Sequence, residues 1–271
     1  MKFTRRDTLI LGAAVSALSL CGVAGANAAE GDTIDQAKLL AVAGDYVDHP
    51  QGSATAPVTI IEYASPTCPH CAAFATDVKP DFIKAYVDTG KVLFITRPFV
   101  RNVLDAAVFM LADAAGPTNY HNVLDTYFKT QTTWAASETP RDAILEIAKQ
   151  LGFTQETFDA ALTNQALFTG MEAVREQALK DFGLQGTPTF YVNGKTLSGD
   201  KSLEQLAAEI DPLVPADFVA SAPAAPTADA PAAAAPAATP APAATPAPAT
   251  SPAAPATDTM SPATPAAPAA Q

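Results

Sequence analysis

Cysteine, histidine and basic residues are scarce in this sequence, and each shortage argues against a class of function. The 271 residues include three cysteines and three histidines, without two ligand pairs at the spacing of a zinc site. Sixteen Lys and Arg residues against 28 Asp and Glu give a formal net charge of −12, which argues against nucleic-acid or anionic-membrane partners. The sequence also lacks a glycine-rich phosphate loop and a dinucleotide-binding fingerprint, which disfavours a nucleotide-dependent enzyme.

The N-terminus has the three parts of an export signal in the expected order. Basic residues at 2, 5 and 6 precede an apolar run, Leu9–Leu20, and small residues follow up to Ala28. Twelve residues are too few to span ~30 Å of hydrocarbon as a helix, but they fit a signal peptide better than an uncleaved anchor. Thr4–Leu9 resembles a twin-arginine signal, although the general secretory route stays open. We expect cleavage after Ala28, which removes Cys21 and changes the net charge to −14.

The C-terminal stretch 221–271 contains 13 of the 24 prolines but has no aromatic residue, Leu, Ile, Val, Lys or Arg. Such a composition cannot bury enough apolar surface to offset the chain entropy lost on folding. We therefore predict a disordered tail. The high overall hydrophobic content is inflated by alanine and does not indicate a membrane protein.

The remaining segment, about 30–215, is long enough for one sizeable core. Apolar, β-branched runs at 57–63 and 91–96 predict buried strands, and a helix kinked at Pro80 should start at Pro69 between them. Residues 102–183 have the spacing of several helices, the first with an apolar stripe of Val103, Leu104, Ala107, Val108 and Leu111. Asn193-Gly194 predicts a hairpin turn, and Ser202 should cap a final helix. The fold class is α/β, a small sheet with a helical insertion of about 80 residues.

The chemistry is predicted at Cys68-Pro69-His70-Cys71, between the first strand and the first helix. Cysteines three positions apart can close a disulfide, and a helix N-terminus or a neighbouring cation lowers a thiol pKa. The helix dipole contributes roughly 0.3–1 kcal/mol, whereas one pKa unit corresponds to about 1.4 kcal/mol. A large shift therefore needs direct donors, from the first-turn N–H groups and His70. Stabilising the Cys68 thiolate stabilises the reduced form and makes the disulfide more oxidising.

Other interpretations of the motif explain less. As a structural staple, so short a loop contributes only ~2 kcal/mol. A zinc site would need further ligands, and His49 and His121 stand alone. Haem attachment would need a histidine directly after Cys71, where the chain has Ala72.

At these residues the chain resembles periplasmic thiol:disulfide oxidoreductases of the DsbA family, which have a thioredoxin-like fold with an inserted helical domain. The resemblance covers about 55–213 and implies that Cys68 is the accessible nucleophile and Cys71 the buried resolving cysteine. Glu62 matches a buried acid that exchanges protons near the second cysteine, although it could simply be a paired carboxylate. Thr187 and Pro188 match a cis-proline loop that binds substrate peptide. Tyr63 and Trp134 are interpreted as packing residues.

On this resemblance the chain divides into an export signal, a lead-in, a thioredoxin-like domain in two parts around the helical insertion, and the tail. The boundaries are 1–28, 29–56, 57–101, 102–183, 184–215 and 216–271. The active protein would be a periplasmic thiol:disulfide oxidoreductase that introduces disulfides into newly exported proteins, without a metal or organic cofactor. The resemblance implies reoxidation by a DsbB-like membrane partner.

Two alternatives stay open. Known oxidases of the family carry Val before the cis-proline, whereas Thr187 also occurs in isomerase and reductase relatives, so electrons could flow in the other direction. Residues 29–56 are nevertheless too few for the dimerisation domain of dedicated isomerases. The chain could instead be an envelope binding or chaperone module that uses its tail to reach a partner.

Overall fold

The computed structural model describes residues 29–220, so the predicted export signal and the Ala/Pro-rich stretch 221–271 lie outside the described residues. A five-stranded sheet with the order β1-β3-β2-β4-β5 organises this part of the chain. The strands are β1 (Pro50–Gln51), β2 (Val58–Ala64), β3 (Val92–Pro98), β4 (Thr189–Val192) and β5 (Lys195–Ser198). Strands β2 and β3 run parallel, while β4 is antiparallel to β2, and β5 to β4.

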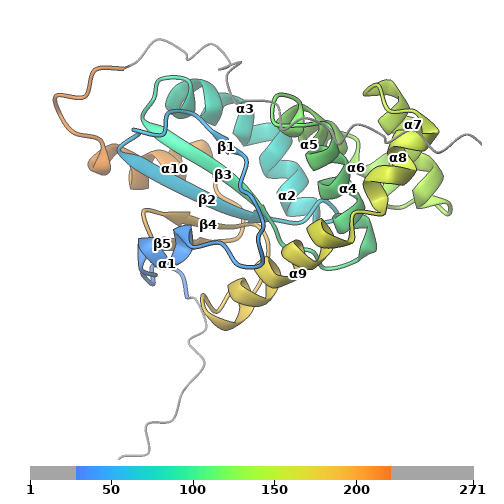
Figure 1. Ribbon diagram of the computed structural model, residues 1–271. Helices are drawn as coiled ribbons and strands as arrows, with labels where there is room; N and C mark the ends of the chain where they lie inside the picture. The colour runs from blue at the N-terminus through green and yellow to red at the C-terminus, as the bar shows by residue number, and fades with distance from the viewer. Residues whose placement is uncertain (1–28, 221–271) are drawn as a thin grey trace, which may run out of the picture. The chain divides into compact units, whose positions relative to one another are not determined.

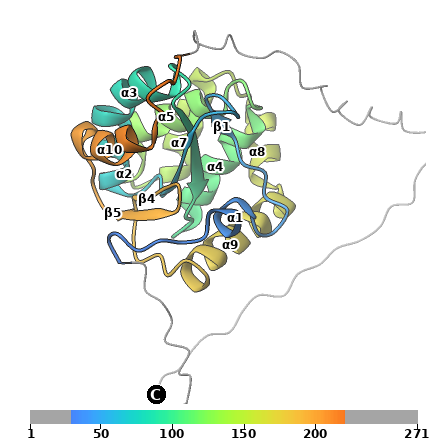
Figure 2. The same cartoon turned by 90° about the vertical axis from the view of Figure 1, so that its left-hand side faces the viewer.

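The two faces of the sheet are covered by different helices (Figures 1 and 2). Alternate residues of β2 belong to different apolar clusters. Ile60 packs with the helical run that follows β2 and with α10 (Leu203–Ile210), whereas Ile61 packs with α1 (Gln36–Leu40) and α9 (Gln165–Lys180). This period-two division is expected of a strand that is buried on both sides. The mixed α/β sheet agrees with the predicted fold class.

The first long helix is regular only in parts. It passes through α2 (Pro69–Ala73), the π-helical turn η1 (Phe74–Val78), α3 (Lys79–Phe82) and a second π-helical turn, η2 (Ile83–Val87). Proline lacks an N–H and its ring collides with the carbonyl four residues earlier, so a wider turn just before Pro80 relieves both problems. The irregularity predicted at Pro80 is therefore present as π-helical turns.

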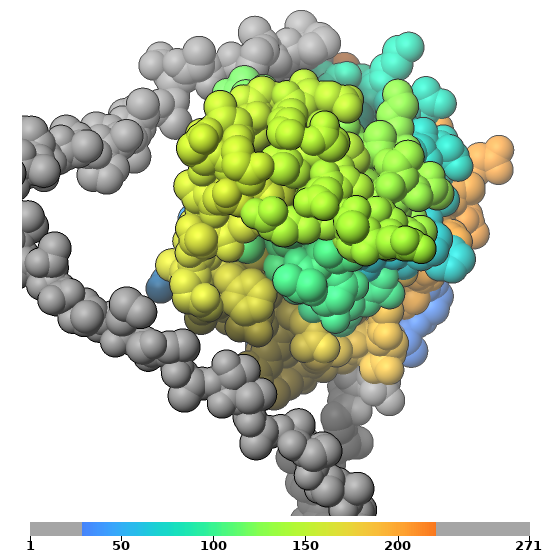
Figure 3. Space-filling view, turned by 90° about the vertical axis from the view of Figure 1, so that its right-hand side faces the viewer, coloured from blue at the N-terminus to red at the C-terminus, as the bar shows by residue number. Residues whose placement is uncertain are grey.

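The helical insertion consists of α4 (Val103–Ala114), α5 (Tyr120–Lys129), α6 (Gln131–Trp134), α7 (Pro140–Gln150), α8 (Gln155–Leu162) and α9. It forms much of the face in Figure 3, where its surface is green to yellow. One prediction about α4 is wrong: Val103 is 74% exposed, whereas Asp105 is completely buried. Asp105 takes the inner position because its carboxylate accepts hydrogen bonds from the loop that precedes Cys68. None of the helices among residues 29–220 is long and apolar enough to cross a membrane.

Local signals in the second half of the chain give the expected structures. Asn193 and Gly194 both have positive φ, at 44° and 95°, and join β4 to β5 in the predicted hairpin. Ser202 caps α10, with the side chains of Ser202 and Gln205 bonding reciprocally to each other's backbone N–H groups. The hairpin places β4 beside β2 and brings the segment before β4 to the end of β2, where the Cys68 loop begins.

Candidate active site

Cys68 and Cys71 lie at the start of α2, directly after the loop that leaves β2. Cys68 is the N-cap residue and Pro69 takes the first helical position, where its missing N–H costs nothing. The N–H groups of the first turn have no partner within the helix and can therefore bind an anion. Both cysteines are free thiols in this structure.

The surroundings of Cys68 favour its thiolate. Its pKa is lowered to about 5, chiefly by a side-chain hydrogen bond from Cys71 and then by Thr187 and the backbone N–H groups of Cys71 and His70, against the opposing effect of burial. The residue keeps only 3% of its surface exposed, less than expected for an accessible nucleophile. Cys68 is covered because it packs against the Thr187 carbonyl, to which the Sγ donates over 3.2 Å.

Cys71 has the opposite properties. It is completely buried, and the Ser65 N–H is 3.5 Å from its Sγ. Burial raises the pKa of Cys71 well above the ordinary value, and the neighbouring Cys68 and Glu62 raise it further. At neutral pH the pair therefore consists of a thiolate at position 68 and a thiol at position 71.

Glu62 lies on β2 and is 2% exposed. Its Oε2 accepts a hydrogen bond from Thr96 Oγ1 on β3 at 3.3 Å. Burial raises the pKa of Glu62 to about 7, while Lys79 and Thr96 oppose that shift. A carboxyl group with such a pKa can both give and accept a proton near neutral pH.

The Thr187–Pro188 peptide bond is cis, as the resemblance to the family implied. Pro188 is buried. Thr187 presents its carbonyl to Cys68, and its Oγ1 is buried without a hydrogen-bond partner among residues 29–220. The Thr187 hydroxyl can therefore donate to the Cys68 thiolate, whereas the carbonyl can bond only to the thiol form.

Residues 45–212 match the family model described as thioredoxin. A thiol:disulfide interchange protein DsbA from Pectobacterium carotovorum is 30% identical over 159 residues, which cover 56% of this chain and 73% of the relative. The chain belongs to the DsbA family. The crystal structure of α-DsbA1 from Wolbachia pipientis matches with a TM-score of 0.60 and 26% identity, over 65% of this chain and 94% of that chain.

A Rickettsia conorii protein, named as a candidate protein-disulfide oxidoreductase, is 30% identical over 164 residues. The match covers 59% of this chain and 58% of the relative, so the chain spans about three fifths of the length of that protein.

The structure of this DsbA-family chain places His70 differently from the other predicted site residues. Its backbone N–H helps to lower the Cys68 pKa. Its imidazole is exposed, and its Nδ1 lies 2.6 Å from Asp200 Oδ2 in the loop after β5. The imidazole thus pairs with a carboxylate, and the backbone supplies the donor that favours the thiolate.

Two residues of the helical insertion hold the active-site loop, and sequence reasoning missed both. Gln131 is buried, and its Nε2 donates to the carbonyls of Pro66 at 2.7 Å and Cys68 at 2.9 Å. Asp105 accepts from Ser65 Oγ at 2.9 Å and from the Thr67 N–H at 2.8 Å. An acidic residue among the apolar positions at the start of α4 could have indicated the role of Asp105, but no local pattern indicates the role of Gln131.

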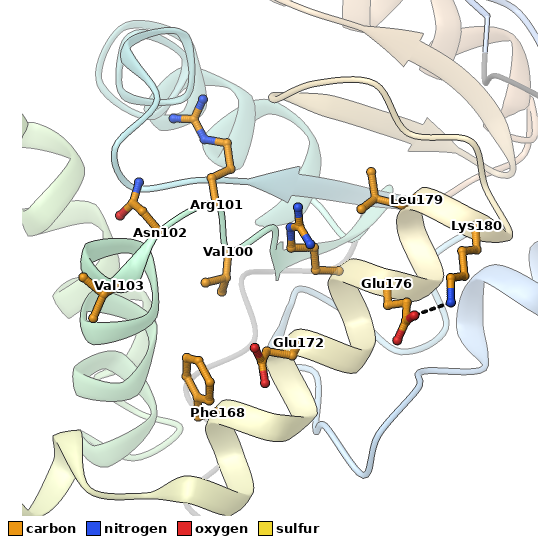
Figure 4. A pocket seen from close by; sticks show the side chains of 10 residues that line it. Val100, Arg101, Asn102, Val103, Phe168, Glu172, Glu176, Leu179 and Lys180 are labelled. Atoms are coloured by element: carbon orange, nitrogen blue, oxygen red, sulfur yellow. Dashed lines mark hydrogen bonds and ion pairs between the residues drawn. The ribbon is translucent and has the colours of Figure 1, made fainter.

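A pocket of about 710 Å³ opens beside this loop, between the start of α4 and α9 (Figure 4). Arg101 and Asn102 line it and also donate to Thr67 Oγ1, next to Cys68. Figure 4 shows Phe168 and Glu172 of α9 facing Val100 and Val103. The lining of this pocket thus combines apolar and charged side chains.

Proposed function

We propose that this chain is a periplasmic thiol:disulfide oxidoreductase that introduces disulfides into newly exported proteins through Cys68 and Cys71. The observation that carries the proposal is the opposite displacement of the two sulfur pKa values, down to about 5 for Cys68 and well up for Cys71. Each pKa unit of thiolate stabilisation is about 1.4 kcal/mol, which for a two-electron couple corresponds to about 30 mV of reduction potential. The site therefore favours the reduced enzyme and an oxidising disulfide.

In the reaction, a substrate thiolate attacks Sγ of Cys68 in the Cys68–Cys71 disulfide. A mixed disulfide forms at Cys68, and Cys71 leaves as a thiolate that takes up a proton. A second substrate thiolate then attacks the substrate sulfur of the mixed disulfide and releases Cys68 as a thiolate. The substrate loses two electrons and gains a disulfide, and the enzyme gains both electrons as a dithiol.

The other site residues have supporting roles in this proposal. Glu62 exchanges a proton with Cys71, Thr187 and Pro188 bind the substrate backbone, and Pro69 and His70 shape the first helical turn that stabilises the thiolate. The dithiol then passes its electrons to a DsbB-like membrane partner, and no metal or organic cofactor takes part. The proposal of export to the periplasm, with cleavage after about Ala28, rests on the N-terminal sequence.

The reduction potential of the full chain in glutathione buffers tests the direction of electron flow. We expect a value above about −200 mV, towards the range of strong oxidants. A value near the thioredoxin potential of about −270 mV would instead support a reductase.

A Cys68→Ser, Cys71→Ser double variant tests whether the thiols are needed at all. We expect this variant to lose all oxidation of a reduced, unfolded substrate protein. A full effect on substrate folding without the thiols would support the binding or chaperone module.

A further inference from the structure

A lysine is buried behind the active site, in a place where lysines are rare unless they are paired. Lys79 is 3% exposed at the start of α3, and its Nζ lies 2.6 Å from Asp125 Oδ1 of α5 in the helical insertion. Taking the ammonium out of water costs free energy that the pairing with the half-exposed Asp125 only offsets, so the pair is weak evidence for a role in stability. Its position suggests another role.

The sheet register places Lys79 over the face that carries Glu62. Ile60 pairs with Phe94 and Glu62 with Thr96, and residues two apart on a strand share a face. The Lys79 Nζ is 5.7 Å from the centre of the Phe94 ring, on that face. Lys79 is also the strongest influence that opposes the rise of the Glu62 pKa, and Asp125 acts in the other direction.

The charges around Glu62 come from three parts of the chain. Besides Lys79 of α3, they are Cys68 and Cys71 at the start of α2 and Asp125 of α5. His121, one turn before Asp125, also faces Lys79, but burial and then Lys79 lower its pKa to about 3, so it is neutral at the pH of interest. The Asp125 side chain is 42% exposed, so the three groups Glu62, Lys79 and Asp125 lead from the buried sheet to the surface of the insertion.

We propose that Lys79 and Asp125 are a positioning pair that sets the acidity of Glu62 for proton exchange with Cys71. This inference rests on the proposed thiol:disulfide exchange. In the reverse of the first exchange step, Cys71 attacks a mixed disulfide at Cys68: its proton passes to the Glu62 carboxylate, a bond forms between the two cysteine sulfurs, and the substrate leaves as a thiolate. The Lys79 ammonium stabilises the Glu62 carboxylate beforehand, and Asp125 offsets part of that positive charge. Through Asp125, the helical insertion thus influences the resolving step.

The test is the pH dependence of the step in which Cys71 attacks the mixed disulfide, measured in the full chain. Oxidised glutathione is added to the reduced protein, and a rapid-mixing experiment records the release of the glutathione bound at Cys68. Lys79→Met should raise the kinetic pKa of this step, by about one unit, because the carboxylate loses its cation. Asp125→Asn should lower it, by about half a unit, because the cation is no longer offset. Below the kinetic pKa, one unit corresponds to about a tenfold change in rate. Lys79→Arg keeps the positive charge and should show the same pH profile as the wild type.

Matched controls are Lys84→Met and Asp142→Asn, which make the same charge changes at exposed positions and should leave the profile unchanged. A ¹³C titration of the Glu62 carboxyl measures the same pKa shifts without catalysis, and the Glu62→Gln variant assigns the signal. If Lys79→Met does not fold, the titration of the milder Asp125→Asn variant is enough for the test. If the wild type exchanges disulfides but Glu62 titrates equally in all folded variants, the pair is structural and this inference is overturned. If the wild type itself fails to exchange disulfides with glutathione, the proposed function fails instead.

Discussion

The surroundings of Cys68 and Cys71 differ more than their separation of three residues suggests. Around Cys68, the first-turn N–H groups, Thr187 and the thiol of Cys71 all favour a thiolate. Around Cys71, complete burial and the nearby Glu62 favour the neutral thiol. Hydrogen-bond donors therefore outweigh burial at Cys68, whereas burial dominates at Cys71.

The largest test of this difference removes one sulfur at a time. Cys68→Ser should reduce oxidation of an unfolded substrate to the background rate, because Cys71 is completely buried and cannot replace it. Cys71→Ser should still react with a substrate disulfide through Cys68, but it should stop as a mixed disulfide that mass spectrometry detects. A stable mixed disulfide at Cys71 in the Cys68→Ser variant would reverse these roles.

Removing the acid beside Cys71 should have the next largest effect. Glu62→Gln keeps the shape and the Thr96 hydrogen bond but cannot accept the Cys71 proton, and general-base contributions are typically about 10²-fold or more. We expect resolution of the glutathione mixed disulfide at pH 7 to slow by at least about tenfold, with the loss of the titration near pH 7. Formation of the mixed disulfide at Cys68 serves as the internal control. An unchanged resolution rate would leave Glu62 as a paired carboxylate only.

The third test acts on the Cys68 side, where Thr187→Val removes a hydroxyl but keeps the side-chain shape. A hydrogen bond to a charged group is worth about 1.5–3 kcal/mol, so the Cys68 pKa should rise from about 5 by about one unit. Thiolate absorbance against pH measures this shift, and the reduction potential should fall in parallel. Thr189→Val is the comparison variant, because it removes a hydroxyl at the start of β4 that donates to the Gly186 carbonyl at 2.8 Å and not to Cys68. An equal Cys68 pKa in the wild type and in Thr187→Val would show that the Thr187 hydroxyl does not stabilise the thiolate.

The low pKa of Cys68 also makes stability depend on pH. The folded pKa lies below the unfolded thiol value of about 8.5, so the stabilisation of the reduced protein by this group is complete above that value and is lost as pH falls towards about 5. Urea unfolding across this pH range should show that the free energy of unfolding of the reduced form falls relative to that of the oxidised form as the solution becomes more acidic. The expected loss is smaller in Thr187→Val.

The sequence predicts the elements that depend on local patterns. The strands at 57–63 and 91–96, the Asn193-Gly194 hairpin and the Ser202 cap each follow from residues close in the chain, and the structure places them within one or two residues of the expected bounds. Strand β1 was missed because two residues carry no periodicity, and they are ordered by pairing with β3. The roles of Lys79 and Gln131 were also missed, since their partners lie 46 and at least 63 residues away in the chain.

A substitution of Gln131 should have the smallest effect on disulfide exchange. It tests whether the backbone of the loop before Cys68 influences the Cys68 pKa. Its amide donates to two carbonyls of that loop, whereas the groups that lower the Cys68 pKa are different donors. Gln131→Leu leaves both carbonyls without this donor, and an unsatisfied buried group costs about 1–3 kcal/mol. Urea unfolding should show that loss of stability, while thiolate absorbance should place the Cys68 pKa within about half a unit of the wild type because the thiolate keeps its own donors. Gln150→Leu, at an exposed position of the same insertion, should change neither quantity. A large pKa shift in Gln131→Leu would mean that the loop backbone, and not the donors around the sulfur, controls the acidity of Cys68.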